Sequence, residues 1–268
     1  MDDLVRLLDI GFHRPSVLAT IARLAWGRLT GAETVMVRSE DIVFEQTPRR
    51  GAGMWASLAG LRYDDDLPTF VDMVHEGDVI LDLGANVGAY TLRAARKIGP
   101  RGRVIAVEPL PEAVSLLRKN IRHNQLTNVT VVEAAVCDID GETIIHVGPR
   151  LNAASVVKKA GVPRKVRAVT IDRLVQELNL QKVDLVKMDI ERAEPLALAG
   201  MKRTIKMYSP VFLFENSASA RQAFERLGYE TGTVNRAGIW ARRAHGVNLW
   251  AKRTTGRDNA SFNTEGVQ

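Results

Sequence analysis

The chain has 268 residues, of which 46% are hydrophobic and 25% are charged. This composition is that of an ordinary globular protein and excludes wholesale disorder, and the length suits one large α/β domain or two small ones. The single Cys137 excludes an internal disulfide, and the five His residues show no zinc-ligand spacing. The formal charge of +6 permits an anionic partner, such as nucleic acid or a membrane surface, without requiring one.

The first 66 residues are interpreted as an accessory segment. Asp2, Asp3 and the His13-Arg14 pair interrupt the pattern of a secretory signal, and no stretch reaches the ~18 apolar residues of a spanning helix. We therefore expect a cytoplasmic protein. Residues 16–30 carry apolar side chains at helical spacing beside arginines, a pattern typical of a helix packed on the domain. The same pattern also fits a helix in peripheral contact with a membrane.

Elements are predicted in chain order from apolar periodicity and from Gly and Pro punctuation. A strand pair is expected at 35–37 and 42–45, before a glycine-containing loop that could cap an acceptor. Beyond residue 67, strands are expected at 79–81, 104–107, 129–136, 143–147, 166–170, 183–188, 211–214 and 229–234, and helices at 69–75, 90–98, 111–121, 172–178, 193–206 and 218–227. Residues 239–241 and 248–251 fit a final hairpin, and 253–268 a disordered tail.

Continuous apolar strands, each followed by a helix, predict a parallel sheet that is covered on both faces. We therefore expect residues 67–252 to form a Rossmann-like, doubly wound α/β domain with a mostly parallel, seven-stranded sheet. Ligands of such sheets bind beyond the carboxyl ends of the strands. The residues that directly follow each strand are the candidates for function.

The first core strand runs into a glycine-containing turn at residues 82–88. Its Gly-x-x-x-Gly spacing differs from the Gly-x-Gly-x-x-Gly spacing of dinucleotide-binding turns. Asp82 would repel a phosphate group and attract a cationic ligand. The next strand ends at Glu108, whose carboxylate can accept hydrogen bonds from a ribose diol. Together these features favour an adenosyl ligand that carries a positive charge over NAD.

Further carboxylates follow the later strands. Asp189 and Glu191 follow residues 183–188, and Glu215 and Asn216 follow residues 211–214. A carboxylate at this edge could act as a general base, and the oxygen atoms of Asp189, Glu215 and Asn216 could bind Mg²⁺. Lys187 should either pair with one of these acids or face the crevice. A purely structural interpretation stays open, because acids are favoured wherever a helix begins.

Four passages, at residues 79–91, 104–109, 170–172 and 184–194, resemble the FkbM-type family of Rossmann-like S-adenosylmethionine-dependent methyltransferases. The resemblance extends over residues 67–252. It implies an O-methyltransferase that acts on a hydroxyl of a sugar, glycolipid or polyketide. One departure is Arg192, which stands where the family has a glycine, so a left-handed turn there would carry a steric cost. Asp172 is interpreted as a helix N-cap.

The resemblance and the strand-end positions together select two sets of site residues. The expected cofactor-binding residues are Asp82, Gly84, Ala85, Asn86, Gly88, Glu108, Ala134 and Asp138. The expected catalytic residues are Asp189, Glu191, Glu215 and Lys187.

We therefore expect an S-adenosylmethionine-dependent O-methyltransferase whose acceptor is a sugar unit of a glycolipid, polysaccharide or lipo-oligosaccharide. Two alternatives stay open: a macrolide or other polyketide acceptor, and a non-catalytic S-adenosylmethionine-binding module. RNA methylation is disfavoured, because the basic residues are spread along the chain and no Asn-Pro-Pro-Tyr motif is present. The expected partner is thus a small molecule or glycolipid and not nucleic acid. The oligomeric state is left open.

Overall fold

The computed structural model describes residues 34–39, 41–46, 66–148, 154–157, 161–215, 217–233 and 248–253, with a few isolated positions between 22 and 31. The predicted strand at 239–241 and nearly all of the predicted helix at 16–30 and of the predicted tail lie outside these residues. In the described part of the chain, no helix combines the length and the apolar character needed to cross a membrane.

Strands and helices alternate through most of the described chain. The strands are β1 (Val35–Ser39), β2 (Ile42–Gln46), β3 (Val79–Leu83), β4 (Arg103–Glu108), β5 (Val129–Glu133), β6 (Ala135–Val136), β7 (Gly141–Val147), β8 (Ala154–Ser155), β9 (Val162–Val169), β10 (Leu185–Met188), β11 (Val211–Glu215), β12 (Tyr229–Thr233) and β13 (Asn248–Arg253). The helices are α4 (Asp66–Met73), α5 (Ala89–Ile98), α6 (Pro111–His123), α7 (Ile171–Glu177), α8 (Glu194–Ala199), α9 (Lys202–Tyr208) and α10 (Ala218–Arg226).

The central sheet has the strand order β12-β13-β11-β10-β3-β4-β5. The five strands from β11 to β5 are parallel, whereas β13 pairs antiparallel with both of its neighbours. This arrangement confirms a Rossmann-like α/β fold with a mostly parallel sheet. The sheet has the seven strands expected: five form its continuous parallel part, and β13 and β12 are added at one edge by antiparallel pairing.

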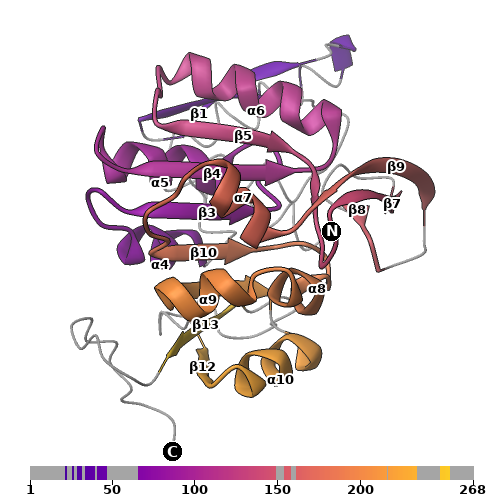
Figure 1. The fold of residues 1–268 in the computed structure, drawn as a ribbon. Coiled ribbons are helices and arrows are strands. Elements are labelled where there is room, and N and C mark those ends of the chain that lie inside the picture. The colour runs from indigo at the N-terminus through magenta and orange to yellow at the C-terminus, as the bar shows by residue number, and fades with distance from the viewer. Residues whose placement is uncertain are drawn as a thin grey trace, which may run out of the picture.

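Two predicted strands leave the central sheet. They become β7 and β9 of a second sheet, which has the order β6-β9-β7-β8. The predicted strand at 129–136 divides between the sheets, because β5 pairs with β4 while Ala135 and Val136 pair with Ala168 and Val169 of β9. In Figure 1 the arrowheads of the parallel strands point toward this second sheet, which therefore lies beyond their carboxyl ends.

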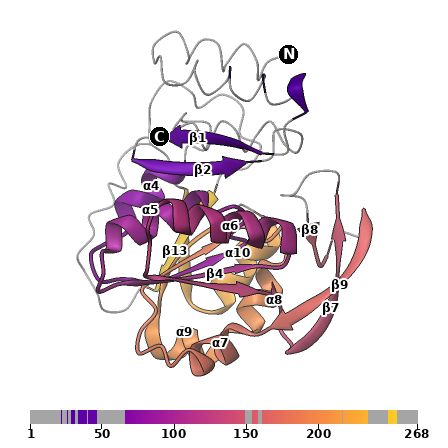
Figure 2. The same ribbon diagram turned by 90° about the horizontal axis from the view of Figure 1, so that it is seen from above.

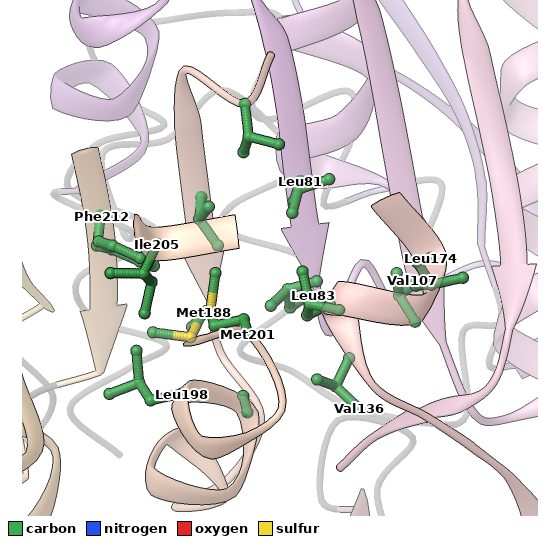
Figure 3. Close-up of a cluster of buried hydrophobic side chains, with 14 of the residues drawn as sticks. Leu81, Leu83, Val107, Val136, Leu174, Met188, Leu198, Met201, Ile205 and Phe212 are labelled. Atoms are coloured by element: carbon green, nitrogen blue, oxygen red, sulfur yellow. The ribbon is translucent and has the colours of Figure 1, made fainter. Parts of the chain in front are cut away.

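Alternating side chains of the central strands build two separate cores. On one face, strand residues such as Leu83, Val107 and Met188 pack with α7, α8, α9 and α10, and Figure 3 shows them converging with Leu198 and Met201. On the other face, the alternate strand residues pack under α4 and α5. Figure 2 shows α5 and α6 on the opposite side of the sheet from α7 and α9. Both faces are therefore covered, as the continuous apolar strands predicted.

The predicted helix at 193–206 is two helices, α8 and α9, because the chain bends at Gly200. A Cβ atom at Gly200 would lie 2.2 Å from the carbonyl oxygen of Cys137, so only glycine permits this approach. Asp172 is not the N-cap of its own helix; it lies in the first turn of α7 and its side chain caps α9 instead. Thr170 caps α7 by accepting a hydrogen bond from the Arg173 amide, whereas Asp172 accepts from the first amides of α9.

The β1–β2 hairpin packs on α6 through two asparagine side chains. Asn124 accepts from the amide of Val43 and donates to its carbonyl, and Asn120 makes the same pair of bonds with Glu45. Asn120 also donates to the Val87 carbonyl at 2.9 Å. The hairpin of the accessory segment is thus fastened to the glycine-containing turn at the same point.

Candidate active site

Five residues form one row across the carboxyl ends of the parallel strands. Phe214, Met188, Leu83 and Val107 pair side by side near the ends of neighbouring strands. The residues that follow them therefore lie side by side as well, and Glu108 is paired with Glu133. This row reads, in spatial order, Glu215, Asp189, Gly84, Glu108 and Glu133. With neighbouring strands about 4.8 Å apart, Glu215 and Glu108 are separated by about 14 Å. Such a row has room for an extended ligand between its two ends.

The glycine-containing turn packs directly against the end of β10. Gly84 has φ 82° and Gly88 has φ 103°, a region that favours glycine. A Cβ atom at Gly84 would lie 2.0 Å from the Asp189 carbonyl oxygen. Between them, Asn86 adopts φ 50° and its Oδ1 atom is buried without a hydrogen-bond partner among the described residues. The predicted turn therefore has the tight geometry that its glycines indicated, with a polar atom left over for a ligand.

Glu108 ties the turn to the end of β4. Its two carboxylate oxygens accept from the backbone amides of Asn86, at 2.9 Å, and Leu110, at 3.0 Å. Burial raises the pKa of Glu108 to about 7, although these two hydrogen bonds oppose the shift. A carboxylate has about four acceptor positions, so two remain for a ribose diol.

Lys187 and Asp82 are cross-strand neighbours beneath the start of α5. The Lys187 Nζ atom lies 3.8 Å from Asp82 Oδ1, 3.5 Å from Asp189 Oδ2 and 4.4 Å from the centre of the Tyr90 ring. Thr91 donates to the other oxygen of Asp82 at 2.5 Å. Burial raises the pKa of Asp82, and the charge of Lys187 opposes that shift. Lys187 is therefore paired, and Asp82 supports the turn from below.

The segment after β10 carries two predicted catalytic residues, Asp189 and Glu191, and a further acid, Glu194. The side chain of Asp189 is about half exposed. Glu191 and Arg192 adopt φ 55° and 74°, so Arg192 does occupy the left-handed conformation, which costs about 1 kcal/mol or more for a residue with a Cβ atom. Glu194 is fully buried, and both of its oxygens lack a hydrogen-bond partner within the described residues. Burial raises the pKa of Glu194 to about 7, and the charges of Glu215 and Asp189 add to the shift.

Glu194 stands at the beginning of α8, where an acid is favoured by the helix alone. Its burial, and the lack of hydrogen-bond partners for its two oxygens among the described residues, nevertheless mark it as part of the acidic cluster. No local signal distinguishes these two situations, because the burial arises from the packing of α8 against the sheet.

The predicted adenine-side residues lie in two places. Ala134 is buried at the end of β5, where its amide donates to the Glu108 carbonyl at 3.2 Å. Asp138 is exposed and follows β6 of the second sheet, and its Cα atom lies beside Gly200. The structure therefore joins Ala134, but not Asp138, to Glu108.

The described residues include no group of three or more His, Cys, Asp and Glu side chains that could hold a metal ion. Of the predicted Mg²⁺ ligands, Asp189 and Glu215 occupy neighbouring strand ends, and Asn216 lies outside the described residues. The residues that the structure describes do not by themselves complete a site for the ion.

The site fits the cationic adenosyl ligand better than it fits the metal. The row places acidic groups on both sides of Gly84, and the turn offers the Asn86 Oδ1 atom, which has no hydrogen-bond partner in the described part of the chain. A glycine turn after one parallel strand and a carboxylate at the end of the next are features of Rossmann-like nucleotide sites. The Gly-x-x-x-Gly spacing and the acidic Asp82 favour, within that group, the class of methyltransferases that use S-adenosylmethionine.

Comparison with known proteins agrees with this class. The model of the methyltransferase FkbM domain matches residues 82–231, more than half of the chain. The chain belongs to the FkbM methyltransferase family, as the sequence resemblance predicted.

Individual relatives are more distant. Methyltransferase 1 of Beauveria bassiana is 28% identical over 147 residues, which cover 46% of this chain and 57% of that protein. The 2-O-methyltransferase NoeI of Sinorhizobium fredii is 26% identical, over 56% of this chain and 70% of its own length. Among solved structures, M. jannaschii TYW2 in complex with AdoMet is similar with a TM-score of 0.47 and 13% identity, over 82% of this chain and 85% of that one. The chain spans little more than half of the Beauveria protein.

Proposed function

We propose that the protein transfers the methyl group of S-adenosylmethionine to a hydroxyl of a sugar unit in a glycolipid, polysaccharide or lipo-oligosaccharide. The observation that carries this proposal is the pair of carboxylates, Asp189 and Glu215, at neighbouring strand ends. They lie beside the glycine-containing turn at residues 82–88, called the cofactor turn from here on. The similarity to a 2-O-methyltransferase supports oxygen as the accepting atom.

Bound S-adenosylmethionine supplies an electrophilic methyl group. The acceptor hydroxyl forms the new O–C bond as the S–C bond breaks, and its proton passes to a carboxylate that acts as general base. Asp189 suits this role, because it is half exposed, adjoins the turn and has the Lys187 Nζ atom 3.5 Å from its Oδ2 atom. Glu215, one strand further from the turn, suits binding of the acceptor. Glu108 and the turn from Gly84 to Gly88 hold the cofactor.

The test compares two amide variants. We expect Asp189→Asn to lower kcat by about 10²-fold or more, the usual contribution of a general base, without weakening S-adenosylhomocysteine binding by more than about threefold. We expect Glu215→Gln mainly to raise KM for the acceptor. Glu177→Gln is the matched control, because Glu177 is a carboxylate of α7 paired with Arg173 at the surface. An Asp189→Asn variant that retains most of its turnover would contradict the assignment.

The acceptor is tested with a panel of glycolipids, oligosaccharides and macrolides. Methylation of a sugar hydroxyl supports the proposal. Methylation of macrolides alone would replace the sugar acceptor with a natural product. Binding of S-adenosylhomocysteine without methylation of any acceptor would favour the non-catalytic alternative.

A further inference from the structure

The turn that follows β10 needs support from outside itself. Glu191 and Arg192 are consecutive residues with positive φ, and neither is a glycine. A side chain with a Cβ atom disfavours this conformation, and two in succession persist only when the surroundings hold them. Glu191 is the second residue after Asp189, so the shape of the turn affects where Asp189 lies.

Ser155 of the second sheet makes the contact that holds this turn. Its Oγ atom donates to the Glu191 carbonyl oxygen at 2.8 Å and accepts from the Val157 amide at 3.1 Å. The residue is 3% exposed, so water does not compete for these bonds. The hydroxyl is thus oriented from both sides.

The position of Ser155 is itself fixed by the second sheet. Ser155 pairs with His146 in β7, and β7 pairs along its full length with β9. Ile145 of β7 is buried against Leu110 and Ala113, which belong to the start of α6 and the loop before it. The second sheet is therefore packed on the methyltransferase core at one side and touches the turn after β10 at the other.

We propose that Ser155 is a positioning residue, which holds the Glu191–Arg192 turn and thereby keeps Asp189 in place beside the cofactor turn. The proposal rests on the proposed function, since it assigns Asp189 to proton transfer. On the far side, the Asp189 carbonyl lies against Gly84, and its amide donates to the Leu83 carbonyl at 3.0 Å. Asp189 is thus fixed on the β3 side by the central sheet and on the other side, through Glu191, by the second sheet.

The first experiment measures Ser155→Ala. We expect kcat to fall by roughly tenfold with S-adenosylhomocysteine affinity unchanged within about twofold, because a small displacement of a catalytic group lowers the rate while the cofactor turn is untouched. Thr170→Ala is the control, since it removes a hydroxyl cap of α7 without touching the turn. A kcat loss of equal size in both variants would mean that Ser155 acts only through global stability and would overturn the proposal.

The second experiment repeats Ser155→Ala in an Arg192→Gly background. Glycine accepts the left-handed conformation without support, so we expect the loss of kcat to shrink from roughly tenfold to about threefold. If Ser155 had a purely structural role, Ser155→Ala would lower kcat by the same factor with Arg192 as with Gly at that position. Equal effects of Ser155→Ala in both backgrounds would therefore contradict the positioning role.

A third measurement does not depend on the acceptor. Amide hydrogen exchange should speed up in Ser155→Ala at residues 190–193, where the Ala193 amide donates to the Ile190 carbonyl at 3.2 Å. Unchanged exchange there would overturn the proposal. If the wild-type protein methylated none of the acceptors, the proposed function would fail, whereas the exchange rates would still decide whether Ser155 holds the turn.

Discussion

We expect Glu108 to make cofactor binding depend on pH. Burial raises its pKa to about 7 in the ligand-free protein, from an ordinary value of 4.5. About one molecule in eleven then carries the ionised carboxylate at pH 6, and about ten in eleven at pH 8. If the ribose diol binds the ionised form, the apparent Kd is the intrinsic Kd divided by the ionised fraction. S-adenosylhomocysteine should therefore bind about tenfold more weakly at pH 6 than at pH 8.

Calorimetric titration of S-adenosylhomocysteine at several pH values measures this effect. In Glu108→Gln, the affinity for S-adenosylhomocysteine should be low, and it should not rise tenfold between pH 6 and pH 8, because the amide cannot ionise. The amino group of the ligand titrates equally with every variant and cancels from the comparison. Glu194→Gln is the matched control, since burial raises the pKa of Glu194 to about 7 as well.

The two variants separate the two acids. Glu194→Gln should keep the tenfold dependence, because the charges that act on Glu194 are those of Glu215 and Asp189, on the other side of the turn from Glu108. If Glu108→Gln kept the wild-type dependence on pH, Glu108 would not be the group that contacts the ribose. Stability gives an independent check of the sign. The folded-state pKa of Glu108 is raised, so its contribution to stability is present below pH 4.5 and is lost as the pH rises through about 7.

Three further predictions concern the turn, a cap and an ion pair. Gly84→Ala should abolish S-adenosylhomocysteine binding, because its Cβ atom would lie 2.0 Å from the Asp189 carbonyl oxygen. Gly77 has a similar φ of 80° but no atom within 4 Å of a Cβ, so Gly77→Ala should retain binding and lose only about 1 kcal/mol of stability. Asp172→Ala should lower Tm by about 3 °C through the lost cap of α9, and Asp172→Asn, which keeps an acceptor oxygen, should lower it less. Lys187→Met should destabilise the protein by about 3 kcal/mol in chemical denaturation, because it leaves the buried charge of Asp82 uncompensated. Adding Asp82→Asn should recover much of that loss. Equal stability of the single and double variants would show that the pair is not coupled.

The sequence predicted well those features that depend on neighbouring residues. β3, α5 and β4 lie within one or two residues of their expected limits, because buried apolar runs and the glycines at 84, 88 and 99 define them locally. The row of strand-end residues followed from the general property of parallel sheets that their carboxyl ends share one edge.

Features that depend on distant partners were missed. The apolar run at 129–136 gives no sign of a break, since its division is decided by pairing with β4 on one side and β9 on the other. Asp172 has the sequence context of a cap for its own helix, yet it binds amides about thirty residues later. Lys187 could have faced the crevice, and only the register between β10 and β3 sets it opposite Asp82.

The two asparagines of α6 have a consequence for the accessory hairpin. They occupy both the amide and the carbonyl of Val43 and of Glu45, the same groups that an additional strand would use, so this edge of β2 is closed to other chains. Because Asn120 also holds the Val87 carbonyl, separation of β2 from α6 would free a residue that anchors the cofactor turn. We therefore expect docking of the hairpin and binding of the cofactor to be linked equilibria, in which each strengthens the other to the same degree.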